Sequence, residues 1–221
     1  MRAPGRDRRR SRGVSTAEVL VGSALGLIAL AGMYSFQLAQ SRALAAQNVY
    51  TESQNVTRTV IDLLSRELRM AAFDPVGAAL PTAPGPSCPG VKQGIIEASG
   101  SRIRFQQDLD GNGAIAGSSE DVTYDLSGSN LVRTDGGVPT TLVSGVTSGG
   151  FALRYFDGSN PPVELIPVGV PDLTPGQRDC VAKVRVTVRA QLPNPDPANP
   201  AMITSEAQSE IAIRNRSLDN F

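Results

Sequence analysis

The chain has 221 residues, a formal net charge of zero at neutral pH, two cysteines and no histidine. This length accommodates one membrane helix and one modest globular domain with its own core. Without histidine or a CxxC pair, the chain lacks the residues for a cysteine–histidine nucleophile or a zinc site, and we expect no enzyme.

A basic leader, Met1 to Gly13, offsets an excess of acidic residues in the rest of the chain. It holds six of the 21 basic residues and one of the 21 acidic residues, which leaves 15 basic and 20 acidic residues in the rest of the chain. Because the only basic cluster lies in a segment that we expect to be cut off, the sequence predicts no nucleic-acid binding. Arginines before an apolar run keep that end in the cytoplasm and direct the rest of the chain outward.

An apolar stretch, Val14 to Phe36, follows the leader. Its 23 residues carry a single charge, on Glu18, and suffice to cross a hydrocarbon core of about 30 Å at about 1.5 Å per residue. A lone carboxylate at membrane depth is energetically unfavourable, so such a group usually has a partner and a function.

The junction between leader and apolar stretch resembles the signal of type IV prepilins, which a dedicated prepilin peptidase cuts after a glycine. In this resemblance the cut falls after Gly13, the mature chain begins at Val14, and the acid at the fifth mature position is Glu18. Val14 stands where the family usually has an aromatic residue. The resemblance implies N-methylation of the new amino terminus, and pairing of Glu18 with the amino terminus of a neighbouring subunit.

Other targeting segments are alternatives. An ordinary signal peptide would be cut at a small-x-small site such as Ala29-Leu30-Ala31. The run Arg8-Arg9-Arg10 offers a twin-arginine signal, but no bulky apolar pair follows it, and a plain uncleaved anchor is the third alternative. Glu18 is unfavourable in the core of a signal peptide, and the helical pattern continues far beyond Ala31. Both observations favour the cut after Gly13.

The helical pattern has no glycine or proline between Gly32 and Pro75. Apolar residues recur there at intervals of three and four, and charged residues occupy much of the opposite face. We therefore predict one helix from near Val14 to about Ala72, whose second half is amphipathic. Two helices joined by a polar hinge near Gln47 to Gln54 are the alternative.

Beyond Pro75 the apolar period changes to two, which is typical of strands. The most regular alternation is Lys183 to Arg189, in which three valines share one face. Short connections favour antiparallel pairing, and we expect the amphipathic half-helix to cover the core-facing side of the sheet. The sequence thus predicts an α+β fold with four segments: a leader (1–13), a transmembrane half-helix (14–36), an amphipathic half-helix (37–74) and an antiparallel β domain (75–221).

Cys88 and Cys180 both lie in the part of the chain that we expect to be exported. An oxidising compartment favours a disulfide between them over two free thiols. Closing so long a loop would stabilise the domain by about 4–5 kcal/mol on chain-entropy grounds.

One segment, Asp108 to Ile115, matches the opening of a calcium loop, with oxygen ligands at alternate positions and a glycine for the turn. The twelfth loop position holds a serine instead of the bidentate acid, so one of the two acids that follow would have to complete the site. A solvated hairpin turn without metal is the alternative. We expect one structural calcium ion, with the predicted ligands Asp108, Asp110, Asn112, the Ala114 carbonyl, and Glu120 or Asp121.

A long amino-terminal helix, an antiparallel sheet packed on it and a loop-rich carboxyl end are together similar to type IV pilins and pseudopilins. The features nearest to minor subunits, of the PilW type or the J group of type II secretion pseudopilins, are Asp108–Asp125, Leu131–Arg133 and Ile213–Asn215. Ser35 stands where many major pilins have a proline, which also fits a minor subunit.

The resemblance implies a structural subunit of a type IV pilus or a type II secretion-like filament. One helix would hold it in the inner membrane, with the remaining domain in the periplasm, before it joins the filament or reaches the cell surface. Its partners would be the prepilin peptidase and other subunits, contacted through the helix. The alternative function is that of an exported or membrane-tethered, calcium-stabilised β domain that binds a surface or a glycan.

Overall fold

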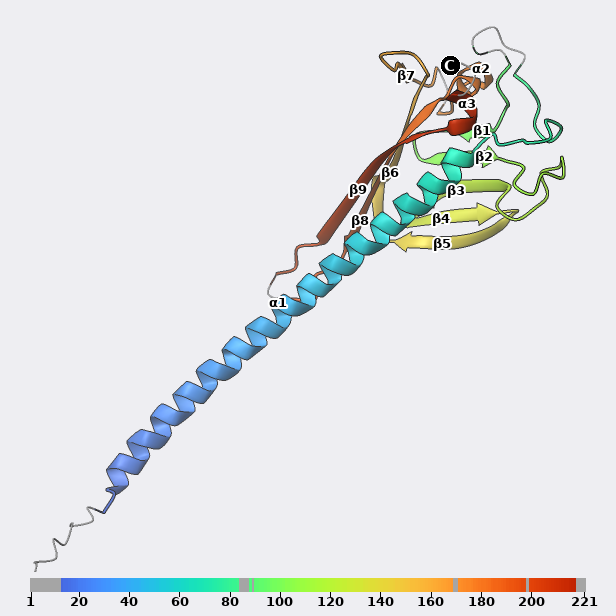
Figure 1. Cartoon of the computed structure of the whole chain (residues 1–221). Helices are drawn as coiled ribbons and strands as arrows, with labels where there is room; N and C mark the ends of the chain where they lie inside the picture. Colours follow the sequence, from blue (N-terminus) through green and yellow to red (C-terminus); the bar gives the residue numbers. More distant parts are fainter. Residues whose placement is uncertain (1–12, 84–87, 89, 169–170, 198, 218–221) are drawn as a thin grey trace, which may run out of the picture.

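One long helix and two antiparallel sheets make up the fold (Figure 1). The computed structural model describes residues 13–217 apart from 84–87, 89, 169–170 and 198, so most of the predicted leader lies outside the described residues. The first helix, α1, projects far beyond the rest of the molecule (Figure 1). The chain is therefore α+β, as the sequence predicts.

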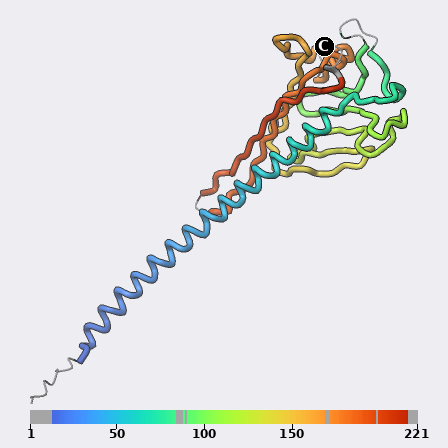
Figure 2. The backbone as a smooth tube through the Cα atoms, in the orientation of Figure 1, coloured from blue at the N-terminus to red at the C-terminus, as the bar shows by residue number. Residues whose placement is uncertain are grey.

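Helix α1, Thr16–Met70, is a single helix of 55 residues. Its observed ends lie within two residues of the predicted ends, and the alternative of two helices with a polar hinge is wrong. The absence of proline and glycine after Gly32 keeps the backbone hydrogen bonds unbroken, and Figure 2 shows the resulting continuous path. The Asn215 side chain closes the carboxyl end by donating to the carbonyls of Met70 and Ala71, at 3.2 and 3.3 Å.

The first sheet contains five consecutive strands, each antiparallel to the next. Its second and third strands lie directly before and after the acidic segment. The acidic segment is therefore the connection between two neighbouring strands. The five strands are β1 (Ile95–Ala98), β2 (Arg102–Gln106), β3 (Asp121–Ser127), β4 (Asn130–Asp135) and β5 (Val138–Ser144).

The second sheet contains four strands in the order β7-β6-β8-β9, again antiparallel. The valines of β8 are fully buried on one face, as the alternation predicts. A short helix, α2 (Pro175–Asp179), precedes β8, and α3 (Arg214–Ser217) follows β9. The strands are β6 (Val146–Phe156), β7 (Glu164–Leu165), β8 (Lys183–Leu192) and β9 (Ile203–Ala212).

Two sheets take the place of the single predicted sheet because the chain changes sheets at Gly145. This residue separates β5 from β6 and has a φ of +76°, which only glycine adopts without strain. Its carbonyl accepts from the Gln191 amide at 2.8 Å, and a Cβ on Gly145 would lie 2.5 Å from the Gln191 carbonyl oxygen. The close approach fixes β6 beside β8 rather than beside β5.

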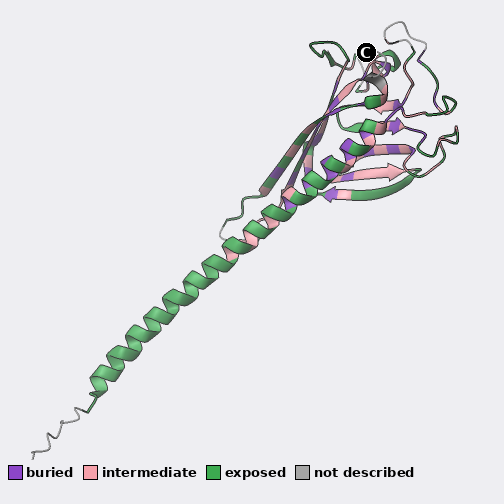
Figure 3. Cartoon of the chain, in the orientation of Figure 1, coloured by how far each residue is buried: buried purple, intermediate pink, exposed green. Residues whose placement is uncertain are grey.

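The second half of α1 packs on the four-stranded sheet, mainly against β9 and β8. Figure 3 shows buried positions along this half and exposed positions along the first half. Leu64 and Leu68 are fully buried, and each contributes about 1.5–3 kcal/mol through burial of its side chain. Nearer the middle of α1, the hydroxyls of Ser53 and Thr57 lie 2.6 and 3.0 Å from the Ser205 hydroxyl on β9. The amphipathic half is thus part of the domain core.

A disulfide joins Cys88 to Cys180 and confirms the predicted pairing, with a Cα–Cα distance of 5.4 Å. The two residues are 92 positions apart in the sequence. The bond connects the loop that follows α1 to the end of α2, just before β8. It therefore ties the irregular segment after the helix to the second sheet.

Leu64→Ala should lower the free energy of unfolding by about 2–5 kcal/mol, because it removes a fully buried side chain from the interface between α1 and the sheets. The matched control is Leu44→Ala, the same change on the same helix at a position that is 59% exposed, which should change stability by less than about 1 kcal/mol. Urea unfolding of the full chain in detergent micelles measures both. Equal losses for the two variants would contradict the described docking of α1.

Candidate functional site

The first half of α1 is apolar and exposed along its length. Every residue from Gly13 to Ser41 is exposed, and large side chains such as Leu20 and Met33 have exposed fractions of 70% and 73%. By length and composition α1 can cross a membrane, and its most apolar window has no buried residue. A core helix of a soluble domain would bury this window, so the first half of α1 is a candidate single-pass anchor.

Two serines within this apolar half form hydrogen bonds within the helix itself. The hydroxyl of Ser23 donates to the Leu20 carbonyl, and that of Ser35 donates to the Gly32 carbonyl, both at 2.9 Å. Such local bonds allow serine to enter an apolar medium without an unsatisfied hydroxyl. The helix surface is therefore compatible with lipid or with other helices at these positions.

Glu18 lies in the first turn of α1, where a negative charge interacts favourably with the helix dipole. No hydrogen bond or ion pair joins its carboxylate to any of the residues that the structure describes. Gly13 and Val14 precede the helix as exposed, non-helical chain, and the Val14 side chain is 72% exposed. The Gly13–Val14 peptide bond therefore lies in an accessible segment, four residues before Glu18.

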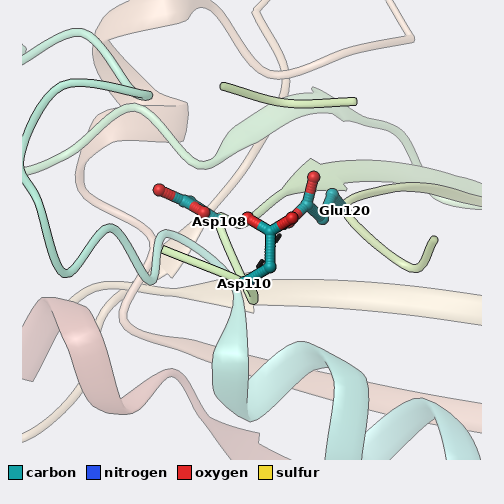
Figure 4. Close-up of side chains that lie close together, drawn as sticks. All are labelled: Asp108, Asp110 and Glu120. Atoms are coloured by element: carbon teal, nitrogen blue, oxygen red, sulfur yellow. Dashed lines mark hydrogen bonds between the residues drawn. The ribbon is translucent and has the colours of Figure 1, made fainter. Parts of the chain in front are cut away.

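A second candidate site is the loop between β2 and β3. One carboxylate oxygen from each of Asp108, Asp110 and Glu120 lies within 4.8 Å of the others, and Figure 4 shows the three side chains gathered there. Asp108 is fully buried, Glu120 is 1% exposed, and Asp110 is exposed. Three carboxylates this close repel one another, and hard oxygen ligands suit a divalent cation. The triad can hold a metal ion.

Backbone amides already surround two of these carboxylates. The two oxygens of Asp108 accept from the amides of Gly111 and Gly113, at 2.8 and 3.0 Å. The two oxygens of Glu120 accept from four amides: those of Leu109, Asp110 and Ala116 at 3.0–3.3 Å, and that of Gly117. A carboxylate has about four acceptor positions, so the loop amides use all those of Glu120 and only part of those of Asp108.

The Glu120 carboxylate organises the loop as an internal anion. Burial alone would raise its pKa, but the four amide donors outweigh burial and hold the pKa of Glu120 below its usual value of 4.5. Gly117 must be glycine for this arrangement, because a Cβ there would lie 2.7 Å from Glu120 Oε2.

Of the remaining predicted ligands, Asn112 lies beside the triad, whereas Asp121 does not. Asn112 donates from its side chain to Asp110 at 2.8 Å, and its side-chain oxygen accepts from the amide of Ala114, which is exposed. Asp121 points elsewhere: Arg104 binds its carboxylate from Nε and Nη2, at 2.8 and 2.6 Å, and thereby lowers the pKa of Asp121. Of the two acids expected to complete the site, the structure brings only Glu120 to the triad.

A partly buried polar network joins the loop to α1, and sequence reasoning missed it. Arg133 on β4 donates to Glu67 of α1 at 2.8 Å and to the Ser119 hydroxyl at 2.9 Å, while Tyr124 donates to Glu67 at 2.5 Å. Asp135 pairs with Arg133 at 3.1 Å and accepts from the Ser119 amide at 2.8 Å. Burial and the adjacent Glu67 carboxylate raise the pKa of Tyr124. The sequence feature that could have indicated this network is Glu67, a charged residue beside the apolar positions of the helix.

Glu120→Gln should lower the free energy of unfolding by about 1–3 kcal/mol, because an amide nitrogen would face backbone donors that now bind carboxylate. The loss should already be present in chelator, because the backbone donors bind the carboxylate without a metal ion. Because the folded pKa of Glu120 lies below its unfolded value of 4.5, its contribution is complete above pH 4.5 and disappears as the pH falls through the folded pKa.

Denaturant unfolding of both proteins across this acid range measures the effect. Wild type should lose its advantage over the variant as the pH falls below 4.5. A constant difference at all pH values would contradict the assignment of Glu120 as the ionised centre of the loop.

In comparisons with known proteins, no family model, no curated protein and no solved structure matches this chain.

Proposed function

We propose that the chain is a minor pilin or pseudopilin, a structural subunit of a type IV pilus or a type II secretion-like filament. The observation that carries the proposal is the division of α1 into two halves within one unbroken helix. The first half is apolar and exposed, begins just after the Gly13–Val14 bond and carries one carboxylate. The second half belongs to the core of an antiparallel β domain.

The continuity of α1 favours this function over removal of a signal peptide. A cut after Ala31 would divide the helix and discard most of its apolar stretch. A cut after Gly13 would leave α1 whole and would fall in exposed chain that a peptidase can reach. Cleavage by prepilin peptidase is therefore compatible with the geometry of the helix start.

Cleavage after Gly13 would also give Glu18 a partner. It would create a charged amino group on Val14, in the same layer of the membrane as the Glu18 carboxylate. Burying either charge alone is costly, whereas opposite charges in contact offset part of that cost. Pairing between the methylated amino terminus of one subunit and Glu18 of the next would thus direct the assembly of neighbouring helices.

The exposed glycines of α1 support contact with other helices. A Cβ at Gly22, Gly26 or Gly32 would meet no atom within 4 Å, so these glycines are not required for packing within the chain. Small residues four positions apart allow close approach of helices in lipid. In the proposed function the protein is held in the inner membrane by α1, has its β domain in the periplasm, and then moves into a filament or to the cell surface.

We further propose that the acidic loop binds one structural calcium ion, which would also serve the alternative function of a tethered binding domain. Asp108 and Asp110 each have acceptor capacity that the loop amides leave unused. Asn112 adds an amide oxygen beside them, and Glu120 adds negative charge. These oxygen donors suit a hard cation, and the exposed Asp110 opens the group to solvent.

Glu18→Gln should leave membrane insertion and cleavage intact but reduce incorporation into filaments by about tenfold or more, because breaking a buried ion pair costs more than about 1.4 kcal/mol. The matched control is Glu52→Gln, on the same helix at an exposed position beside the domain. The measurement is the fraction of the chain in sheared filaments relative to whole cells. Wild-type incorporation of the Glu18 variant would contradict the assembly role of this carboxylate.

Calcium should raise the melting temperature of the full chain in micelles by several degrees relative to chelator, since a ligand at a hundredfold its dissociation constant adds about 2.7 kcal/mol. Asp110→Asn should abolish this shift with little effect on stability in chelator, because Asp110 is exposed. The control Asp125→Asn changes an acid on β3 outside the triad and should retain the shift. Identical melting curves of wild type in calcium and in chelator would show that the loop is a polar turn that binds no calcium.

A further inference from the structure

The outer face of the four-stranded sheet carries three arginines around one hollow. The buried valines of β8 alternate with Arg185, Thr187 and Arg189. These two arginines and the threonine therefore lie on the face opposite to α1. Together with Arg154 of β6 and Gln208 of β9, they line a hollow of about 330 Å³. We call the set Arg154, Arg185 and Arg189 the arginine face.

Two of these arginines are direct neighbours of like charge. The register between β6 and β8 places Arg154 opposite Arg185. Like charges directly opposite each other on a sheet are unfavourable. The acid that pairs with Arg154 is Glu164, 3.7 Å away, and the Arg154 side chain is 62% exposed. An anion in the hollow would relieve this repulsion.

Arg185 and Arg189 each have N–H donors that the paired acid does not use. Arg189 donates from Nε and Nη2 to one oxygen of Glu206, at 2.9 and 2.6 Å, and Arg185 donates in the same way to one oxygen of Glu210. Within the described part of the chain, Nη1 of both arginines has no hydrogen bond. Exposed ion pairs contribute only about 0–1 kcal/mol, so a second carboxylate can bind without a large loss.

An apolar surface adjoins the arginine face. A second hollow of about 230 Å³ shares Arg185 and has a mixed lining: Phe156 and Pro162 are its apolar part, and Lys183 and Glu210 are its other charged residues. The Arg185 guanidinium lies 5.0 Å from the centre of the Phe156 ring. Val163 and Ile166, which flank the short strand β7 next to β6, are 56% and 66% exposed. Arginine and aromatic side chains are enriched at protein–protein interfaces, whereas a purely anionic sugar would leave the apolar part uncovered.

We propose that this outer face is a docking surface for a partner protein that presents an acidic segment with interspersed apolar side chains. Carboxylates of the partner bind the arginine face, and an apolar side chain enters the hollow beside Phe156. The arginine face and Lys183 together supply four basic groups against the three acids paired with them, a small positive balance, although the chain after the leader has more acidic than basic residues overall. The proposal is independent of filament assembly, because the surface lies opposite to α1.

The test uses the full chain in micelles and a fluorescent probe peptide of alternating glutamate and leucine, with fluorescence anisotropy as the readout. Wild type should bind this peptide, and should not bind the same peptide with glutamine in place of glutamate. The double variant Arg154→Gln/Arg189→Gln should weaken binding by about tenfold or more. The control Arg102→Gln removes an exposed, ion-paired arginine from the other sheet and should leave binding unchanged. Ile166→Ser should weaken binding through the apolar part.

Several results would overturn the proposal. Equal binding of the glutamate and glutamine peptides would exclude recognition of carboxylates. Failure of the glutamate peptide to bind, or unchanged binding by the double variant, would exclude the arginine face as the docking surface. Competition by a sulfated oligosaccharide as strong as that by unlabelled peptide, together with no effect of Ile166→Ser, would assign the surface to a glycan instead.

Discussion

The rest of the structure depends on the rigidity of α1 across two environments. An unbroken series of backbone hydrogen bonds joins an exposed half to a half that packs into the core of the β domain. Because no hinge separates them, the position of the domain follows directly from the position of the exposed half. Leu64 and Leu68 anchor the helix through burial, and Asn215 closes its end, so the domain cannot reorient without unpacking its own core.

The acidic loop shows how one sequence pattern can serve two kinds of chemistry. In a calcium loop, oxygens converge on a cation, whereas here backbone amides converge on the Glu120 carboxylate. Asp108 and Asp110 keep free acceptor capacity beside that centre, so binding of a cation would add to an arrangement that is already ordered. Through Ser119, Arg133 and Glu67, the same loop also fixes the five-stranded sheet to α1.

Much of the fold could be predicted from local patterns. The three- and four-residue spacing and the lack of helix breakers predict α1 to within two residues, and the alternating valines predict the buried face of β8. The division into two sheets depends on the close approach of Gly145 to Gln191, which no local pattern encodes. Likewise, the sequence offers two adjacent acids to the metal site, and only strand pairing shows that Arg104 takes the second of them.

The most direct test of the account is the amino terminus of the mature protein, measured by intact-mass and fragment mass spectrometry after purification from membranes. We predict a chain that begins with N-methylated Val14, because only a cut after Gly13 preserves α1 and supplies a charged partner for Glu18. A mature chain that begins at Gly32 would show that the apolar half of α1 is a removed signal peptide. That result would contradict the proposed role in a filament.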